Sequence, residues 1–169
     1  MLEKLRKAMK AADIDMLLIP SADPHGSEYP EEYFKARKHF SGFTGSAGTL
    51  LIWQGGAGLW TDGRYFLQAA RQLEGSGIDL FKMREPGVPT VDEFIAENIK
   101  GGVLGADLRT ISASEGMELE KGGAILKDCR SLIDGCWEGR PELSREPAYV
   151  LPMELAGVSS SDKLGAVRA

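Results

Sequence analysis

The stretch TLLIWQGGAGLWTDGRYFLQAARQL, residues 49–73, contains two strands, the turn between them and a helix. Thr49–Trp53 and Ala57–Thr61 are mostly apolar runs of strand length, separated only by residues 54–56. Such a short connection between two strands predicts a hairpin. Tyr65–Leu73 then repeats apolar residues at helical spacing. A hairpin that leads directly into a helix indicates a sheet with helices packed against it.

The sequence on either side of this hairpin alternates between helical and strand patterns. Thr90 precedes one helical pattern, and Glu93 three residues later would complete a capping box. The expected helices cover residues 2–12, 31–40, 91–99 and the segment from Ser112 or Ser114 to about Lys127; the expected strands are 16–20, 78–83, 103–106 and 130–133. Alternation with one hairpin inside predicts an α/β fold, in which a mixed sheet has helices on both faces.

Composition limits the classes of function that the chain can have. Its 169 residues are enough for one domain with a hydrophobic core, and 43% of them are apolar. The formal net charge of −5 argues against a general nucleic-acid binder or a binder of anionic membranes. No apolar run approaches the roughly 20 residues of a membrane helix, and the charged N-terminus is not a signal peptide. Cys129 and Cys136 lack metal-site spacing and are expected to be reduced thiols, which favours a cytoplasmic protein.

The composition changes after Trp137. Residues 1–138 are expected to form the α/β domain, and residues 139–157, which are rich in proline and charge, an extended linker. Residues 158–169 contain serines that can cap a new helix. A single short helix after a long linker has nothing in this chain to pack on. We therefore expect the chain to be part of a longer polypeptide, with this helix opening the next domain.

The glycine-rich loop Ser41–Thr49 invites comparison with nucleotide-binding loops. A phosphate loop follows a strand and precedes a helix, because the helix N-terminus receives the anion. Here a helix precedes the loop and a strand follows it. The loop contains neither a G-K-[ST] sequence nor a G-x-G-x-x-G sequence. The favoured interpretation is a tight turn in which glycines allow close packing of the backbone.

Three carboxylates, those of Asp23, Asp62 and Asp107, lie near expected strand ends. If they converged on divalent metals, the chain could be a free-standing phosphoryl-transfer enzyme. Turn and cap aspartates are common at such positions and are the alternative. His25 and His39 are the only histidines; nothing places both a Ser or Cys nucleophile and an acid around either one, and no set of three or four metal ligands is visible. Neither a catalytic triad nor a zinc site is therefore predicted.

Arg64 lies just after the hairpin, where the next helix is expected to begin. A helix N-terminus is already electropositive, so a cation gains nothing there from the helix dipole. Asp62 could cap this helix, and Gly63 could take a positive φ. Two interpretations of Arg64 remain: its guanidinium pairs with Asp62 or another acid, or it points outward to bind a carboxylate or a peptide carbonyl.

Three segments, PSADPHGSEY, FSGFTGSAGT and LWTDGRYFLQA, together resemble the N-terminal domain of aminopeptidase P, the Xaa-Pro aminopeptidase of the creatinase/prolidase group. The resemblance continues through FKMREPGVPT to SSSDKLGAVR and covers nearly the whole chain. It implies a three-layer α/β/α fold with a ribonuclease-H-like mixed sheet. A second domain of similar fold and then a catalytic domain would follow. That last domain would hold Mn²⁺ or other divalent ions on Asp, His and Glu ligands, none of which falls within residues 1–169.

The resemblance also implies a role for this chain. It would be a non-catalytic domain, inactive alone and without metal or cofactor, that shapes the substrate cleft and supports a homodimer. By motif match, Arg64 would contact the peptide substrate, whose second residue is proline. Gly26 and Pro30 depart from the pattern expected in the loop PHGSEYPEEY, which leaves contacts through that loop open. An interaction module without a peptidase is a further alternative.

Overall fold

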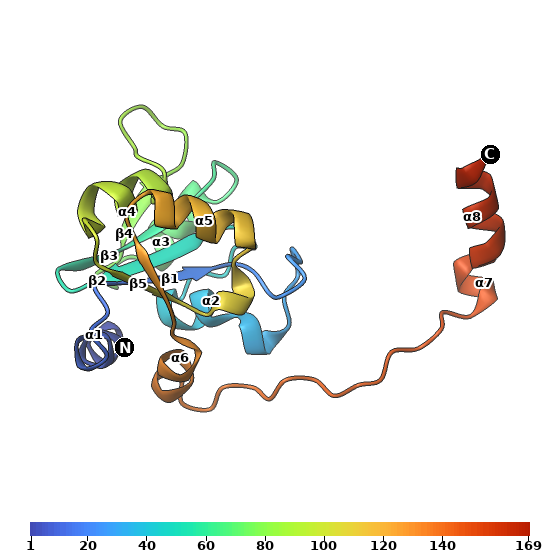
Figure 1. Cartoon of the computed structure of the whole chain (residues 1–169), viewed down its shortest axis with the longest axis horizontal. Helices are drawn as coiled ribbons and strands as arrows, with labels where there is room; N and C mark the ends of the chain where they lie inside the picture. Colours follow the sequence, from blue (N-terminus) through green and yellow to red (C-terminus); the bar gives the residue numbers. More distant parts are fainter.

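A computed structural model describes all residues from 1 to 169, and its centre is one six-stranded sheet (Figure 1). The strands are β1 (Met16–Pro20), β2 (Thr49–Trp53), β3 (Gly56–Thr61), β4 (Asp79–Lys82), β5 (Val103–Ala106) and β6 (Ile125–Asp128). They lie side by side in the order β4-β3-β2-β1-β5-β6. The predicted hairpin is present as β2 and β3, in which Thr49 pairs with Trp60 and Trp53 with Gly56.

Strand β2 is the single reversed strand of the sheet. It runs antiparallel to both β1 and β3, whereas β4 is parallel to β3, and β5 and β6 are parallel to β1. The C-terminal ends of the other five strands therefore meet at one end of the sheet, which we call the carboxyl end. The first residue of β2 lies there as well, because Thr49 pairs with Pro20 of β1. The sheet is mixed, as the sequence predicts.

Helices cover both faces of the sheet and give three layers. The helices are α1 (Leu2–Ala11), α2 (Ala36–Ser41), α3 (Phe66–Gln72), α4 (Val91–Ile99), α5 (Ala113–Lys121), α6 (Arg130–Cys136), α7 (Met153–Ala156) and α8 (Ser160–Arg168), with short 3-10 helices at Glu32–Phe34 and Leu108–Thr110. One buried cluster joins the sheet to α1, α2, α3 and α6, and a second joins its other face to α4 and α5. Alternation along β1 supplies both clusters, with Leu17 in the first and Leu18 in the second.

Capping side chains fix the starts of the two helices on the second face. Thr90 and Glu93 form the predicted capping box of α4. Ser112 and Glu115 form an equivalent box at α5, so the start of that helix lies at Ser112 and not at Ser114. Each box satisfies backbone N–H groups that the first helical turn leaves unpaired.

Two predictions near the C-terminal part of the domain are wrong. Helix α5 ends at Lys121 and not near Lys127, because Gly122 and Gly123 interrupt it and residues 125–128 pair with β5 as a strand. Residues 130–133, expected as a strand, belong to helix α6, which buries Ile133 and Cys136.

The predicted helix over 31–40 is divided into two helices, the 3-10 helix Glu32–Phe34 and α2. Gly42, with a φ of 73°, forms the C-cap of α2.

The two cysteines lie at the start and the end of α6. Both are buried and free, and burial raises the pKa of both thiols. Trp137, which follows α6, stacks on His39 of α2 with ring centroids 4.4 Å apart and planes at 12°. This pair joins the last helix of the domain to α2.

His39 gives the domain a pH-dependent stability. Burial lowers the pKa of its imidazole in the folded state, so the unfolded chain takes up the proton first as pH falls. The contribution of the neutral His39 imidazole to the free energy of unfolding is therefore complete above about pH 6.5, and it is lost as the pH falls below that value. We expect the free energy of unfolding, measured in urea from pH 7.5 to 5.5, to fall more steeply for the wild type than for His39→Gln. Parallel curves for the two proteins would contradict this.

Beyond the sheet, residues 140–152 run as an extended segment without helix or strand, and α7 and α8 lie apart from the domain (Figure 1). Arg140 holds the start of this segment. Its Nε and Nη2 donate to the carbonyl oxygen of Tyr33 at 2.9 and 2.7 Å, and its guanidinium lies 3.7 Å from the centroid of the Tyr33 ring. None of the helices has the length and apolar character needed to cross a membrane.

Candidate functional site: the carboxyl end of the sheet

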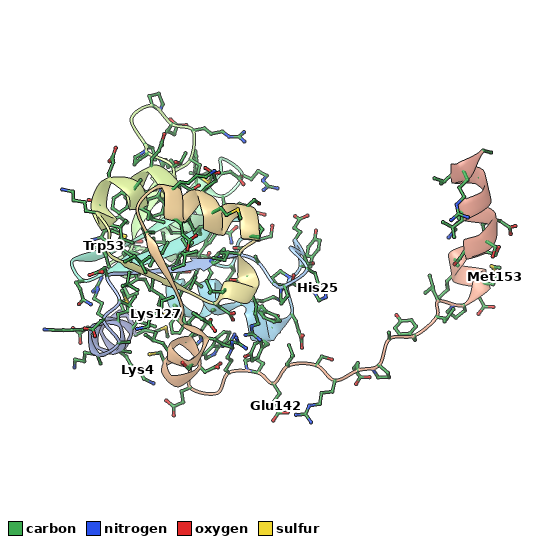
Figure 2. All side chains as sticks on the ribbon, in the orientation of Figure 1. Lys4, His25, Trp53, Lys127, Glu142 and Met153 are labelled. Atoms are coloured by element: carbon green, nitrogen blue, oxygen red, sulfur yellow. The ribbon has the colours of Figure 1, made fainter.

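Loops from distant parts of the sequence gather at the carboxyl end. The loop after β1, the glycine-rich loop before β2 and the segment after β5 surround an open groove of about 680 Å³. Its lining is mainly polar and includes Asp23, Ser46, Arg109 and Glu115. Figure 2 shows His25 on the loop at this end, while Trp53 lies at the opposite end of the sheet.

An Asp-x-Arg pair follows three of the strands that end here. Asp62 and Arg64 follow β3, Asp107 and Arg109 follow β5, and Asp128 closes β6 with Arg130 two residues later. In each pair the aspartate accepts a hydrogen bond from the backbone N–H of its arginine, and the guanidinium closes an ion pair onto the same carboxylate. The turn thereby holds the arginine at a fixed distance from the strand end.

Arg64 is the most exposed of the three arginines. Its Nε and Nη2 donate to the Asp62 carboxylate at 2.9 and 2.8 Å, while 64% of the Arg64 side chain remains accessible. Hydrogen bonds from Arg64 hold the pKa of Asp62 below its usual value, and Asp62 raises the pKa of Arg64. Nη1 donates no intramolecular hydrogen bond. The guanidinium is thus paired with Asp62 and still presents an open face to solvent.

Two expectations about this turn are wrong. Tyr65, and not Asp62, is the residue at the N-cap of α3, and no side chain caps that helix. Gly63 does not have a positive φ. The carboxylate of Asp62 is occupied by the backbone and side chain of Arg64, so it is not available to the helix.

Tyr65 connects this turn to the glycine-rich loop. Its hydroxyl forms a 2.8 Å hydrogen bond with the hydroxyl of Ser46, and its ring packs edge-on against Phe43 at 5.8 Å. The Cζ of Arg64 lies 5.3 Å from the centroid of the same ring. A Cβ atom on Gly45 would lie 2.3 Å from Phe43 and 2.8 Å from Tyr65. The glycine is therefore required for close packing, as the sequence predicts for this loop.

Arg37 of α2 holds the glycine-rich loop in place through hydrogen bonds. It is only 6% exposed, and it donates to the carbonyl oxygens of Phe43 and Gly45 and to the hydroxyl of Ser21. It has no carboxylate partner, and burial lowers its pKa to about 10. Arg37 could not be selected from the sequence, because Lys35 and Lys38 beside it suggest a solvated helix face. The hydrogen bonds of Arg37 form only in the folded domain, where the loop that follows α2 packs back against this helix.

Comparison with known proteins adds to this geometry. The sequence profile of the creatinase/prolidase N-terminal domain family matches residues 1–136. This chain belongs to that family. A probable Xaa-Pro aminopeptidase P of Coccidioides posadasii is 42% identical to it over 174 aligned residues, which cover 99% of the chain and 28% of the relative. The chain thus spans a little over a quarter of that protein.

Solved structures of family members have the same fold. An X-prolyl aminopeptidase of Caenorhabditis elegans, described as a cytosolic enzyme with a di-nuclear active site, is 32% identical with a TM-score of 0.82. That match covers 99% of this chain and 30% of the enzyme. An N-terminal creatinase/prolidase-like domain of a putative metallopeptidase from Corynebacterium diphtheriae is 24% identical with a TM-score of 0.56 and supports the fold alone. It covers 75% of this chain and 91% of that structure.

In this member of the creatinase/prolidase family, the three aspartates considered for metal chemistry are engaged separately. Asp23 accepts the backbone N–H groups of His25 and Ser27, and Asp62 and Asp107 are paired with their own arginines. No group of three or more His, Cys, Asp or Glu side chains is arranged to hold a metal ion. These residues do not fit a two-metal centre, and the phosphoryl-transfer alternative is not favoured.

The histidines have structural surroundings as well. His25 lies on the exposed loop with its Nδ1 3.7 Å from Asp23, and 86% of its side chain is accessible. His39 packs against Phe40 and Trp137. Neither has an arrangement of neighbours that would serve as a catalytic base paired with a nucleophile.

Proposed function

We propose that this chain is the non-catalytic N-terminal domain of a metal-dependent Xaa-Pro aminopeptidase, an enzyme that removes the N-terminal residue preceding proline. Family membership and the names of the relatives support this. The catalytic groups and the divalent metal, with Mn²⁺ as first candidate, would lie elsewhere on the polypeptide, and this chain alone would be inactive. The cytosolic C. elegans relative supports a cytoplasmic location.

The division of the chain follows from this proposal. Residues 1–138 would be the family domain, residues 139–157 a linker, and residues 158–169 the first helix of the next domain. The exposure of Leu164 and Val167 on α8 supports the last point, because their apolar surface is uncovered here. In the complete enzyme, the domain would shape one side of the substrate cleft and contribute to a homodimer.

The observation that carries the proposal is the exposed, anchored guanidinium of Arg64. A peptide with proline in second position lacks the N–H at the bond to be cleaved, so it must be recognised through its carbonyl groups or its carboxylate. An arginine supplies donors for both groups. The Asp62 pair holds Arg64 in place at the carboxyl end of the sheet while Nη1 stays free. We assign substrate binding to Arg64.

Replacing Arg64 with alanine in the full-length enzyme tests this assignment. We expect kcat/KM for an Xaa-Pro peptide to fall roughly 10- to 100-fold, which corresponds to the loss of one charge-assisted hydrogen bond. Most of the change should lie in KM. The exposed side chain makes a large loss of folding stability unexpected, and thermal unfolding would check this.

Arg130→Ala is the matched control, since Arg130 has the same Asp-x-Arg pairing after β6. It should leave both kinetic constants unchanged. If Arg64→Ala also leaves them unchanged, Arg64 does not bind substrate. Hydrolysis of Xaa-Pro peptides by the isolated chain would contradict the non-catalytic role.

A further inference from the structure

Arg64 is held by more than its own turn. Asp62 lies only two residues away and is itself partly exposed, so the ion pair alone does not tie Arg64 to the core. The neighbouring contact that reaches the interior is the ring of Tyr65, 5.3 Å from the guanidinium carbon. A guanidinium next to an aromatic ring in this range is attracted to it.

Tyr65 is in turn fixed at two points. The 2.8 Å hydrogen bond to Ser46 holds its hydroxyl, and the edge-on contact with Phe43 holds its ring. Phe43 is completely buried. A tyrosine fixed at both its ring and its hydroxyl has little rotamer freedom, so Arg64 packs against a rigid surface.

The glycine-rich loop that carries Phe43 and Ser46 is itself anchored. Arg37 of α2 donates hydrogen bonds to the carbonyl oxygens of Phe43 and Gly45 in this loop. Contacts therefore run without a break from buried Arg37, through the loop and Tyr65, to exposed Arg64. Of the other two pairs, Arg109 also lies near aromatic rings, those of Tyr33 and Phe34, whereas Arg130 contacts only Asp128 through its guanidinium.

We propose that Tyr65, anchored by Ser46, is a positioning residue for Arg64. The inference rests on the proposed substrate contact of Arg64. Tyr65 limits the directions in which the guanidinium can point, and this lowers the entropy that Arg64 loses when it binds a peptide. The two motifs FSGFTGSAGT and WTDGRY act as one unit, in which the first holds the second in place.

A double-mutant cycle in the full-length enzyme tests the proposal. Tyr65→Phe keeps the ring and removes only the hydroxyl that contacts Ser46. We expect it to raise KM about three- to tenfold with kcat unchanged, because Arg64 then loses more side-chain freedom when it binds the peptide. In an Arg64→Ala background, the same substitution should change KM no further, because the residue that it positions is absent. Ser46→Ala should reproduce the effect of Tyr65→Phe and should not add to it.

Tyr33→Phe is the matched control, because the Tyr33 hydroxyl contacts Arg109 at the neighbouring pair. It should leave KM unchanged. If Arg64→Ala raises KM and Tyr65→Phe does not, the positioning role is wrong and the proposed function stands. If the Tyr65→Phe effect is equally large without Arg64, Tyr65 acts in another way and the inference is overturned. If Arg64→Ala itself has no effect, Arg64 does not bind substrate, and the inference about Tyr65 is overturned with that assignment.

Discussion

Arg37→Met is expected to lower the free energy of unfolding by roughly 2–4 kcal/mol, because it leaves two loop carbonyl groups and one hydroxyl without their donors. The buried charge itself opposes folding, as the pKa of about 10 indicates. Methionine removes that cost, which reduces the net effect but does not cancel it, since the unpaired acceptors stay buried. Urea unfolding at neutral pH measures the change.

Lys38→Met provides the comparison for Arg37→Met, because it removes one positive charge from the same helix at an exposed site. Its effect should stay within about 0.5 kcal/mol. Arg37→Lys should recover little, since an ammonium group cannot direct donors to three acceptors as a planar guanidinium does. An unchanged unfolding midpoint for Arg37→Met would show that the loop does not depend on Arg37.

Gly45→Ala should be the next most damaging change, with a loss of about 1–3 kcal/mol from overpacking. The added methyl group would lie 2.3 Å from Phe43 and 2.8 Å from Tyr65. Phe43 is completely buried, so the backbone of the loop at Gly45 must move to relieve the closer of these contacts. Tyr65, which packs on the same loop, must shift with it. Urea unfolding measures the loss, and near-ultraviolet circular dichroism should report the altered surroundings of the tyrosine.

Gly55→Ala is the control for Gly45→Ala. Gly55 lies in the hairpin turn, its φ is not positive, and a Cβ there would meet only the Trp53 ring at an ordinary 3.7 Å. We expect nearly unchanged stability. Equal stability of the Gly45→Ala variant and the wild type would mean that the loop can relax around the extra methyl group, and that Tyr65 is less rigidly held than its contacts indicate.

Local sequence patterns were sufficient to predict an element where a short turn or a specific cap defines its end. The hairpin β2–β3 and the capping box at Thr90 are examples, because their signals lie within a few residues. Patterns were insufficient around residues 121–136. Strand β6 has four mostly exposed residues, so it shows no alternation, and pairing with distant β5 decides its structure.

The site shows the same division between local and distant contacts. Pairing of Arg64 with Asp62 could be considered from their spacing, since both lie in one turn. Arg37 could not be selected, because its acceptors come from a loop whose position depends on the whole sheet. The contact between Tyr65 and Ser46 joins two motifs 19 residues apart, and the sequence contains no sign that they meet.

The strand order also has a consequence for the order in which the chain folds during synthesis. Strand β1 pairs on one side with the early β2, but its other neighbour, β5, is made much later; the side chain of Asp15 accepts the N–H of Val103, 88 residues further on. Contacts of such long sequence separation form slowly. Until β5 arrives, the apolar strand β1 has one unpaired edge, which is a surface for aggregation. The emerging chain is therefore most vulnerable between the completion of the hairpin and the arrival of residues 103–106.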